Sequence, residues 1–504
     1  MNRITTLLFL FSFFQLPAWG QFQFSLPGHN GSKTGPATVV SSAPGMGDPT
    51  VPVCAFDELN LQRSEQDPVF AAEWQQFLDV IPAMSAGGGQ EKSTIGPLLS
   101  ISVVVHVIHS GEPVGTGENI SDEQIQAQID ILNEDYTALN PQFYNTPSQW
   151  TGIAGTPNIQ FCLASADPAG NPANGITRHN LTVTGSSWSN NNINSVIKPA
   201  TKWDPTRYFN IYVLPIPGTS AAGGVVGFGN YPTPSLIGAD QDGVVIDYRW
   251  FGAPGFGVSG WRPLTHETGH YLGLPHPFKG NSCSADDGIA DTPDIDKATR
   301  EYVTLDCTNE YPPGPVSCGN EHLYVNYMDY VTENCYTSFT EGQSNVMRAV
   351  LDGTSSGFGY GSRHALITNA PSQCNLLAND AGIIRLLSPA ATTCTPDSLS
   401  AIVTLRNFGV DDLTSTLFIS QIDTLLTDTF LWQGSLFPGG NLDVELPAYL
   451  APEGNYDLTI RTAMPNGVAD ERPANDTIAV SRFTFVAIPP PLFEDFENET
   501  VFPT

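Results

Sequence analysis

The stretch His266-Glu267-Thr268-Gly269-His270-Tyr271-Leu272-Gly273-Leu274-Pro275-His276 carries the pattern HExxHxxGxxH. Residues four apart lie on one face of a helix, so His266 and His270 can bind one ion, with Glu267 beside them. Gly273 can adopt a left-handed conformation that ends the helix, and His276 can then turn back as a third ligand. Zinc lowers the pKa of a bound water to about 7, so Glu267 can take its proton. The pattern therefore predicts a zinc-dependent hydrolase.

A second motif, Asn326-Tyr327-Met328-Asp329-Tyr330, follows the first one in the sequence. In this order the motif resembles the Met-turn beneath the zinc site of the metzincin clan. Within that clan, the chain resembles the pappalysin family of secreted metallopeptidases. The resemblance covers most of residues 98–371 and also includes the segments 103–109, 119–121, 132–136, 161–164, 243–248 and 291–293.

The resemblance implies a role for each residue of the two motifs. The zinc ligands are then His266, His270 and His276, and Glu267 is the general base and acid. Met328 lies beneath the metal. Tyr330 matches a tyrosine that can donate a hydrogen bond to the oxyanion of the tetrahedral intermediate, which stabilises the transition state more than the substrate.

Substrate preference is left open at one position. In a related branch, an acid directly before the last cysteine of the catalytic domain selects basic side chains after the scissile bond. Here that position is Asn334, with Glu333 before it. The sequence alone therefore does not establish cleavage before Arg or Lys.

The chain of 504 residues is long enough for several domains. Met1–Gly20 has a basic start, a short apolar run and a small-x-small exit, which is typical of a signal peptide. We expect a propeptide at 21–97, an α/β (α+β) metzincin-type catalytic domain with a twisted mixed sheet at 98–371, and an immunoglobulin-like β-sandwich at 372–489. Residues 490–504 read as a linker and the start of a further module.

Local patterns predict the elements of the catalytic domain. Ile101–Ile108 is a nearly continuous apolar run, which indicates a strand covered on both faces. Ser121 is expected to cap a helix whose buried stripe includes Ile125, Ile129 and Leu132. Tyr208–Leu214 and Val244–Tyr248 are expected as further strands, the second as the edge strand that receives an extended substrate. His106 and His109 are expected to be core histidines.

The eight cysteines can form disulfides, because the protein is predicted to be exported. Spacing alone does not choose a pairing. The pappalysin resemblance implies a crossed arrangement, Cys283 with Cys318 and Cys307 with Cys335. Cys374 and Cys394 are expected to pair locally.

Cys54 lies in the predicted propeptide, in the segment Cys54-Ala55-Phe56-Asp57-Glu58, which precedes an expected helix at Pro68–Ile81. A thiolate is a strong zinc ligand, so Cys54 can displace the catalytic water and keep the enzyme latent. Asp57 can do the same through oxygen. The alternatives are a disulfide between Cys54 and Cys162, or two inert buried thiols. The glycine-rich segment Ser85–Gly89 is the expected activation site.

Acidic residues crowd the segment after the zinc motif. Solvated acid explains most such runs. Resemblance to calcium-binding pappalysins implies a Ca²⁺ site made by Asp287, the carbonyl of Ala290 and the hydroxyl of Thr292.

The net charge of −31 argues against nucleic acid and anionic membranes as partners, and no later segment is apolar for long enough to span a bilayer. We therefore expect a secreted, monomeric zinc endopeptidase that acts on extracellular proteins or peptides. The alternative is a non-enzymatic adhesin that keeps the domain as a scaffold. The intact Glu267 argues against that alternative, since a scaffold does not need the acid.

Overall fold

The computed structural model describes residues 52–87, 97–181, 192–216, 218–220, 223–353, 362–369, 378–394, 399–409, 411–423, 425–473 and 475–485. The predicted signal peptide, the first part of the predicted propeptide, positions 88 and 89 of the predicted activation site and the module expected at 490–504 lie outside these ranges. Ser85, the first residue of that site, is the buried last residue of a helix, not part of an exposed linker. Within them, no helix is both long and apolar enough to cross a membrane.

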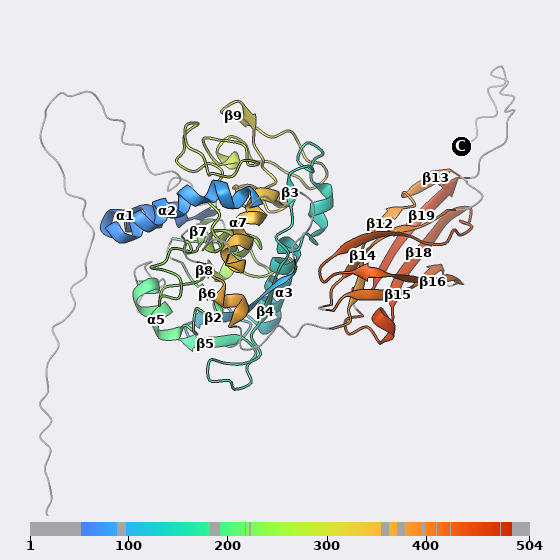
Figure 1. Cartoon of the computed structure of the whole chain (residues 1–504), viewed down its shortest axis with the longest axis horizontal. Coiled ribbons are helices and arrows are strands. Elements are labelled where there is room, and N and C mark those ends of the chain that lie inside the picture. The colour runs from blue at the N-terminus through green and yellow to red at the C-terminus, as the bar shows by residue number, and fades with distance from the viewer. Residues whose placement is uncertain are drawn as a thin grey trace, which may run out of the picture. The chain divides into compact units, whose positions relative to one another are not determined.

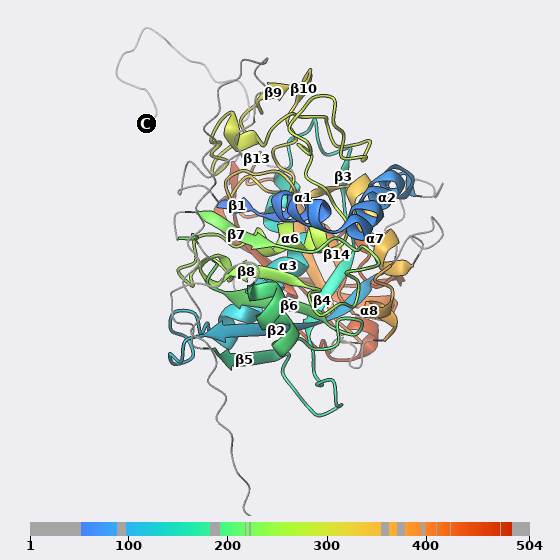
Figure 2. The ribbon, with the colours of Figure 1, turned by 90° about the vertical axis from the view of Figure 1, so that its left-hand side faces the viewer.

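A seven-stranded sheet runs through the part of the chain that carries the zinc motif. Its order is β1-β7-β8-β6-β2-β4, and β5 also pairs with β2 (Figure 2). The strands are β1 (Pro52–Cys54), β2 (Leu99–His109), β4 (Ile159–Leu163), β5 (Ile176–Asn180), β6 (Phe209–Leu214), β7 (Gly224–Phe228) and β8 (Val244–Asp247). All pairs are parallel except β7 with β8, so the sheet is mixed, as predicted.

The prediction of the edge strand of this sheet is wrong. Val244–Tyr248 was the predicted edge strand, but β8 lies between β7 and β6 and is fully buried. The strand outside it is β7, a glycine-containing run whose outer side pairs with β1. The prediction is wrong because the apolar sequence of β8 indicates only that the strand is buried. It does not indicate which strands lie on either side of it.

Three helices accompany the sheet: α3 (Asp122–Tyr136), α6 (Pro263–Tyr271) and α7 (Glu341–Asp352). The side chain of Ser121 accepts a hydrogen bond from the Gln124 N–H at the start of α3, and the predicted stripe of α3 is buried. Thr340 and Gln343 form a capping box at α7. His106 is a buried core residue, bonded through its two ring nitrogens to Thr177 and Asn210.

The segment predicted to be a propeptide forms two helices, α1 (Phe56–Gln66) and α2 (Pro68–Ser85) (Figure 1). The helix α2 begins where the sequence predicted and runs four residues further. The sequence did not predict α1, whose residues show almost no apolar stripe. Phe56, Phe77 and Ile81 belong to the same buried core as the zinc helix α6, so these propeptide residues are packed as part of the fold.

Short elements connect these parts. They are β3 (Ala154–Gly155), β9 (Val316–Ser317), β10 (Asn320–Glu321), β11 (Phe339–Thr340), α5 (Lys198–Thr201), α8 (Ala365–Thr368), the π-helical turn η3 (Ile193–Ile197) and the 3-10 turns η2 (Pro141–Asn145), η4 (Tyr248–Trp250) and η5 (Thr299–Glu301).

The C-terminal part is all β apart from the turn η7 (Pro465–Gly467), and it has its own core. One sheet has the order β12-β14-β17 and the other β13-β19-β18-β15-β16. The strands are β12 (Ala381–Ser388), β13 (Thr392–Cys394), β14 (Ile402–Asn407), β15 (Leu413–Ile422), β16 (Leu425–Leu436), β17 (Asn441–Glu445), β18 (Gly454–Ala463) and β19 (Thr477–Phe485). Tyr456, Leu458 and Ile460 are buried on β18, as their alternation predicted. The immunoglobulin-like assignment stays a prediction.

Candidate active site

Helix α6 carries the first two histidines of the motif, and all of its residues are buried. After Leu272 the chain turns at Gly273, which has a φ of +100°, and the Leu274 N–H donates to the Gly269 carbonyl. A side chain at Gly273 would meet the ring of Phe77 at 2.6 Å. The motif therefore needs glycine at 273 both for the turn and for close packing.

The turn brings three ring nitrogens together. The Nε2 atoms of His266, His270 and His276 stand 3.1 Å from one another in every pair. Their Nδ1 atoms lie 2.7 Å from the Tyr327 carbonyl, 2.6 Å from the Leu274 carbonyl and 2.7 Å from Asp57 Oδ2. These oxygens can only accept, so each Nδ1 carries the proton and each Nε2 presents a lone pair.

This arrangement fits a zinc ion. Three lone pairs that face one another repel unless a cation lies between them, and burial lowers the pKa of His266 and His270, which opposes protonation as a substitute. Nitrogens bound to tetrahedral zinc at about 2.0–2.1 Å stand roughly 3.3 Å apart, close to the separation found here.

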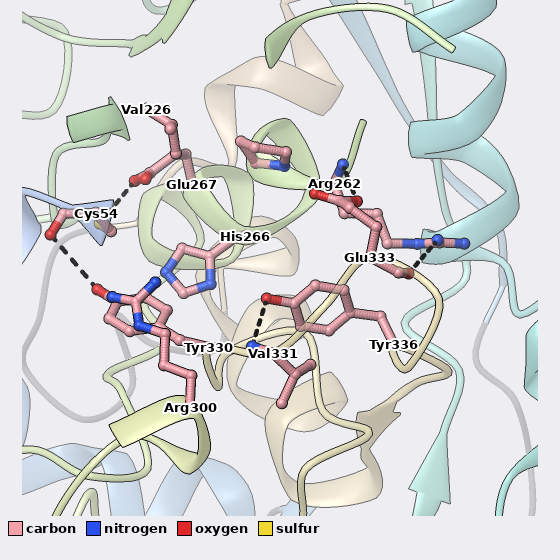
Figure 3. Close-up of a pocket in the computed structure, with 11 residues that line it drawn as sticks. Cys54, Val226, Arg262, His266, Glu267, Arg300, Tyr330, Val331, Glu333 and Tyr336 are labelled. Carbon is pink, nitrogen blue, oxygen red and sulfur yellow. Dashed lines mark hydrogen bonds between the residues drawn. The ribbon is translucent and has the colours of Figure 1, made fainter. Parts of the chain in front are cut away.

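The thiol of Cys54 lies beside the three histidine nitrogens. Its Sγ lies with the three Nε2 atoms in a group whose members are all within 4.8 Å of one another. The same Sγ donates to Oε2 of Glu267 at 3.3 Å (Figure 3). Histidine nitrogen and cysteine sulfur are both zinc ligands, and four such donors make a closed, tetrahedral site.

The two latency candidates of the sequence therefore lie in different places. Cys54 offers its sulfur to the metal position, whereas Asp57 binds the opposite nitrogen of His276. The alternative in which Asp57 is the metal ligand is not what the structure shows. Cys54 is a free thiol and Cys162 is disulfide-bonded, which excludes the alternative pairing of these two.

Glu267 is fully buried beside the ligands. Burial raises the pKa of its carboxyl to about 8, and its Oε1 has no hydrogen-bond partner in the described part of the chain. The backbone of β7 passes close to it, and a Cβ at Gly227 would lie 2.8 Å from its Cγ. A buried carboxyl with one free oxygen can hold a proton and release it again.

The segment that resembles a Met-turn packs against helix α6. Met328 is fully buried, and its Sδ would lie 2.5 Å from a Cβ at position 269, so the motif needs Gly269. The hydroxyl of Tyr330 lies 3.1 Å from His276 Nε2 and 3.4 Å from the Cys54 carbonyl. The guanidinium of Arg300 covers the Tyr330 ring at 4.1 Å (Figure 3).

A small pocket adjoins these residues. Cys54, Val226, Arg262, His266, Glu267, Arg300, Tyr330, Val331, Glu333 and Tyr336 line it (Figure 3). Glu333 faces this pocket, whereas Asn334 turns away and donates to Asp306 Oδ1 at 2.9 Å and Thr308 Oγ1 at 2.6 Å. Three of the residues that line the pocket lie outside the two motifs: Arg262, Arg300 and Glu333. The sequence pointed to the pair 333–334 but did not identify the two arginines.

The side chain of Arg262 lies beside Glu333, but its hydrogen bonds go to partners other than the Glu333 carboxylate. Arg262 Nε binds Asp135 at 3.2 Å, and its Nη2 donates to Gln142. The Glu333 carboxylate accepts the backbone N–H of Arg262, at 3.1 Å, and that of Trp261. Burial raises the pKa of Glu333 to about 7.

The chain between α6 and α7 is held by two disulfides. Cys283 joins Cys318 and Cys307 joins Cys335, the crossed arrangement that the resemblance implied. The predicted pair of Cys374 and Cys394 involves a position outside the described residues.

The segment predicted to be a propeptide also covers the edge of the sheet. β1 pairs with β7 in parallel, in the register Pro52 with Gly224 and Val53 with Val225. The next residue is Cys54, and this pairing places it beside the three histidine nitrogens. Phe56 then stacks its ring on that of His270, with centroids 3.6 Å apart.

Comparisons with known proteins agree with this geometry. The M43 peptidase family model, described as pregnancy-associated plasma protein-A, matches residues 191–352. An extracellular metalloprotease of Arthroderma otae is 29% identical over 269 residues, which are 52% of this chain and 82% of the relative. One of Arthroderma benhamiae is 29% identical over 277 residues, 54% and 83% of the two chains.

Two solved structures from Tannerella forsythia are also similar. Mature mirolysin in complex with a cleaved peptide is 33% identical, with 56% of this chain and 99% of that one covered and a TM-score of 0.45. A promirolysin mutant is 31% identical, with 63% and 97% covered and a TM-score of 0.49.

Proposed function

This chain belongs to the pappalysin family of metallopeptidases, and from that premise we propose how its residues act. The protein is a secreted zinc endopeptidase that is made as a latent precursor. The observation that carries the catalytic assignment is the group of three Nε2 atoms, each freed by a hydrogen bond at Nδ1, with the Glu267 carboxyl beside them. The scaffold alternative has no use for this carboxyl and is set aside.

In the mature enzyme, zinc held by His266, His270 and His276 supplies Lewis acidity that polarises the scissile carbonyl and acidifies a water. Glu267 takes the proton of the attacking water at its carboxylate and passes it to the leaving amine. Its burial favours the protonated form, so the proton is held until the amine can accept it. The substrate lies along β7 once β1 has left, since this edge then offers free backbone groups.

Tyr330 is proposed to donate its hydroxyl to the oxyanion. The hydroxyl lies near His276 Nε2, and Arg300 holds the ring in place from its other side. A donor at this place stabilises charge that develops only in the transition state.

Tyr330→Phe is therefore expected to lower kcat by on the order of 10²-fold while KM changes little, measured by steady-state hydrolysis of a peptide. Tyr324→Phe is the control, because Tyr324 is also buried but donates to the Pro312 carbonyl. An unchanged kcat in Tyr330→Phe removes the tyrosine from the mechanism.

The pocket next to the metal position supports a substrate preference. Glu333 lines it, and Arg262 is already neutralised by Asp135. A basic side chain in this pocket would pair with Glu333 and restore its ionised form, which burial disfavours in the empty pocket. We assign cleavage before Lys or Arg to Glu333, in place of Asn334.

Glu333→Gln is expected to lower kcat/KM by on the order of 10²-fold for peptides with Arg after the scissile bond, because a buried charge pair is lost. Peptides with Leu at that position should be affected less. Glu301→Gln, which changes an exposed acid, is the control. An equal loss for both peptides would show that Glu333 only supports the fold.

We also propose a Ca²⁺ site in the segment after the zinc motif. Asp287 is buried and accepts from the Thr292 hydroxyl at 2.8 Å and the Ile289 N–H at 2.9 Å. Burial raises its pKa to about 8, and Oδ1 of nearby Asp291 is buried with no hydrogen-bond partner among the residues described. These features favour a hard cation held by Asp287, Thr292 and the carbonyl of Ala290.

A further inference from the structure

A group of acids stands out at the start of the C-terminal β part. Most acidic residues of this strongly negative chain have no need of a ligand, because water solvates them. Asp380 and Asp476 differ, since they are only 2% and 6% exposed. They lie at the N-terminal ends of β12 and β19, and Asp470 joins them from the segment before β19.

Hydrogen bonds bring these acids together. Asp470 Oδ2 accepts the N–H of Ala381 at 3.0 Å, which ties the segment before β19 to the first residue of β12. Asp380 Oδ1 accepts from the side-chain amide of Asn475 at 2.8 Å. The carboxylates of Asp470 and Asp476 contact each other, and the charges of Asp470 and Asp380 both raise the pKa of Asp476, which burial raises first, to about 7.

Both oxygens of Asp470 accept backbone N–H groups, from Ala381 and Arg472, but other oxygens of the group lack a donor within the described chain. Oδ1 of Asp476 is buried with no hydrogen-bond partner in the described ranges, and so is Oδ1 of Asn475. The Asn475 amide nitrogen is held by Asp380, so its oxygen cannot be replaced by the nitrogen without loss of that bond. The ion pair of Asp380 is a long one, 3.8 Å from Arg472 Nε to Asp380 Oδ2, and the Arg472 side chain is 55% exposed.

Asp476 is buried against the half-buried Asp470, and the two carboxylates repel unless something positive lies between them. A shared proton and a cation are the two physical answers. Oxygen ligands select hard cations, and extracellular modules bind Ca²⁺ with dissociation constants of about 10⁻⁴–10⁻³ M. Asp476 and Asn475 each have one oxygen without a donor among the residues that the structure describes. A cation can bind both oxygens, whereas a proton shared by two carboxylates would leave the Asn475 oxygen unused.

We propose that Asp470 and Asp476 bind a Ca²⁺ ion at the start of the C-terminal β part, with Asp380 orienting Asn475 beside it. The ion joins the segment before β19 to the first residues of β12. This site is separate from the one proposed at Asp287 and does not depend on the peptidase assignment.

Calcium binding to the full-length precursor tests the proposal, measured by equilibrium dialysis at up to about 10 mM Ca²⁺. Asp470→Asn/Asp476→Asn is expected to bind one ion fewer per chain than the wild type. Asp412→Asn, which removes an exposed acid of the same β part, should bind as many as the wild type. Asp287→Asn reports on the other site, and its loss should add to that of the double variant. Equal binding by the double variant and the wild type overturns the proposal.

Hydrogen exchange at Ala381 provides a local measurement that a folding defect cannot imitate. In calcium-free buffer Asp476→Asn, which keeps Asp470 as the acceptor of this amide, should protect it at least as well as the wild type, because it removes the repulsion. Calcium should then slow exchange in the wild type several-fold and leave Asp476→Asn unchanged. If wild-type protection instead rises as the pH is lowered below about 7 and ignores calcium, the pair shares a proton and the site binds no cation.

Discussion

Glu267→Ala is expected to lower kcat/KM for peptide hydrolysis by on the order of 10²–10⁴ or more, and to leave zinc content and fold intact. The reason is a division of labour within one helical turn. His266 and His270 direct their lone pairs at the metal position, whereas the Glu267 carboxylate accepts a hydrogen bond from the Cys54 thiol and is not in the ligand group. Removal of the carboxylate therefore removes the proton shuttle and none of the three nitrogens.

The measurement is steady-state hydrolysis by the mature form, together with zinc by elemental analysis. Thr268→Ala is the matched control, because Thr268 is the next buried residue of α6 and its hydroxyl has no hydrogen-bond partner within the described residues. Activity near the wild-type level in Glu267→Ala, at full zinc content, would contradict the mechanism.

Cys54→Ala is expected to activate the intact precursor by on the order of 10²-fold, or to let it process itself in the segment near Gly87–Gly89. Structural zinc sites contribute about 10–16 kcal/mol over four ligands, so one ligand accounts for roughly 3 kcal/mol of the closed state. What remains in the variant is the β1–β7 pairing and the stacking of Phe56 on His270.

Asp57→Ala separates the two propeptide side chains, since Asp57 holds His276 at Nδ1 and is not in the ligand set. The Asp57→Ala precursor should have no peptidase activity, because its Cys54 is intact. If only Asp57→Ala becomes active, the carboxylate is the switch. If neither variant does, latency is steric and resides in β1 and α1.

The zinc site could be predicted because its information is local. The spacing of three histidines and Gly273 fixes one helical turn and one reversal, and both are found. The N-cap of α3 and the buried strand β2 were predictable for the same reason. The disulfide crossing came from resemblance, since the spacing of the cysteines allows several pairings.

What failed depends on contacts between distant segments. In the strand order, β7 lies outside β8. The sequence of β8 is the more typical of a strand, so the sequence alone pointed to β8 as the edge. Asp57 and Cys54 are three residues apart on the chain, and only the start of α1 after Cys54 decides which of them reaches the metal. Glu333 and Asn334 are neighbours, and the bonds of Asn334 to Asp306 and Thr308 decide which one faces the pocket.

X-ray absorption at the zinc edge tests the central claim most directly, on the wild-type precursor and on the mature enzyme. The account predicts one zinc per chain, with three nitrogens and one sulfur in the precursor, the Zn–S distance at about 2.3 Å, and no sulfur in the mature form. A precursor spectrum with only nitrogen and oxygen neighbours would contradict the Cys54 assignment. Absence of stoichiometric zinc from both forms would contradict the metal centre itself.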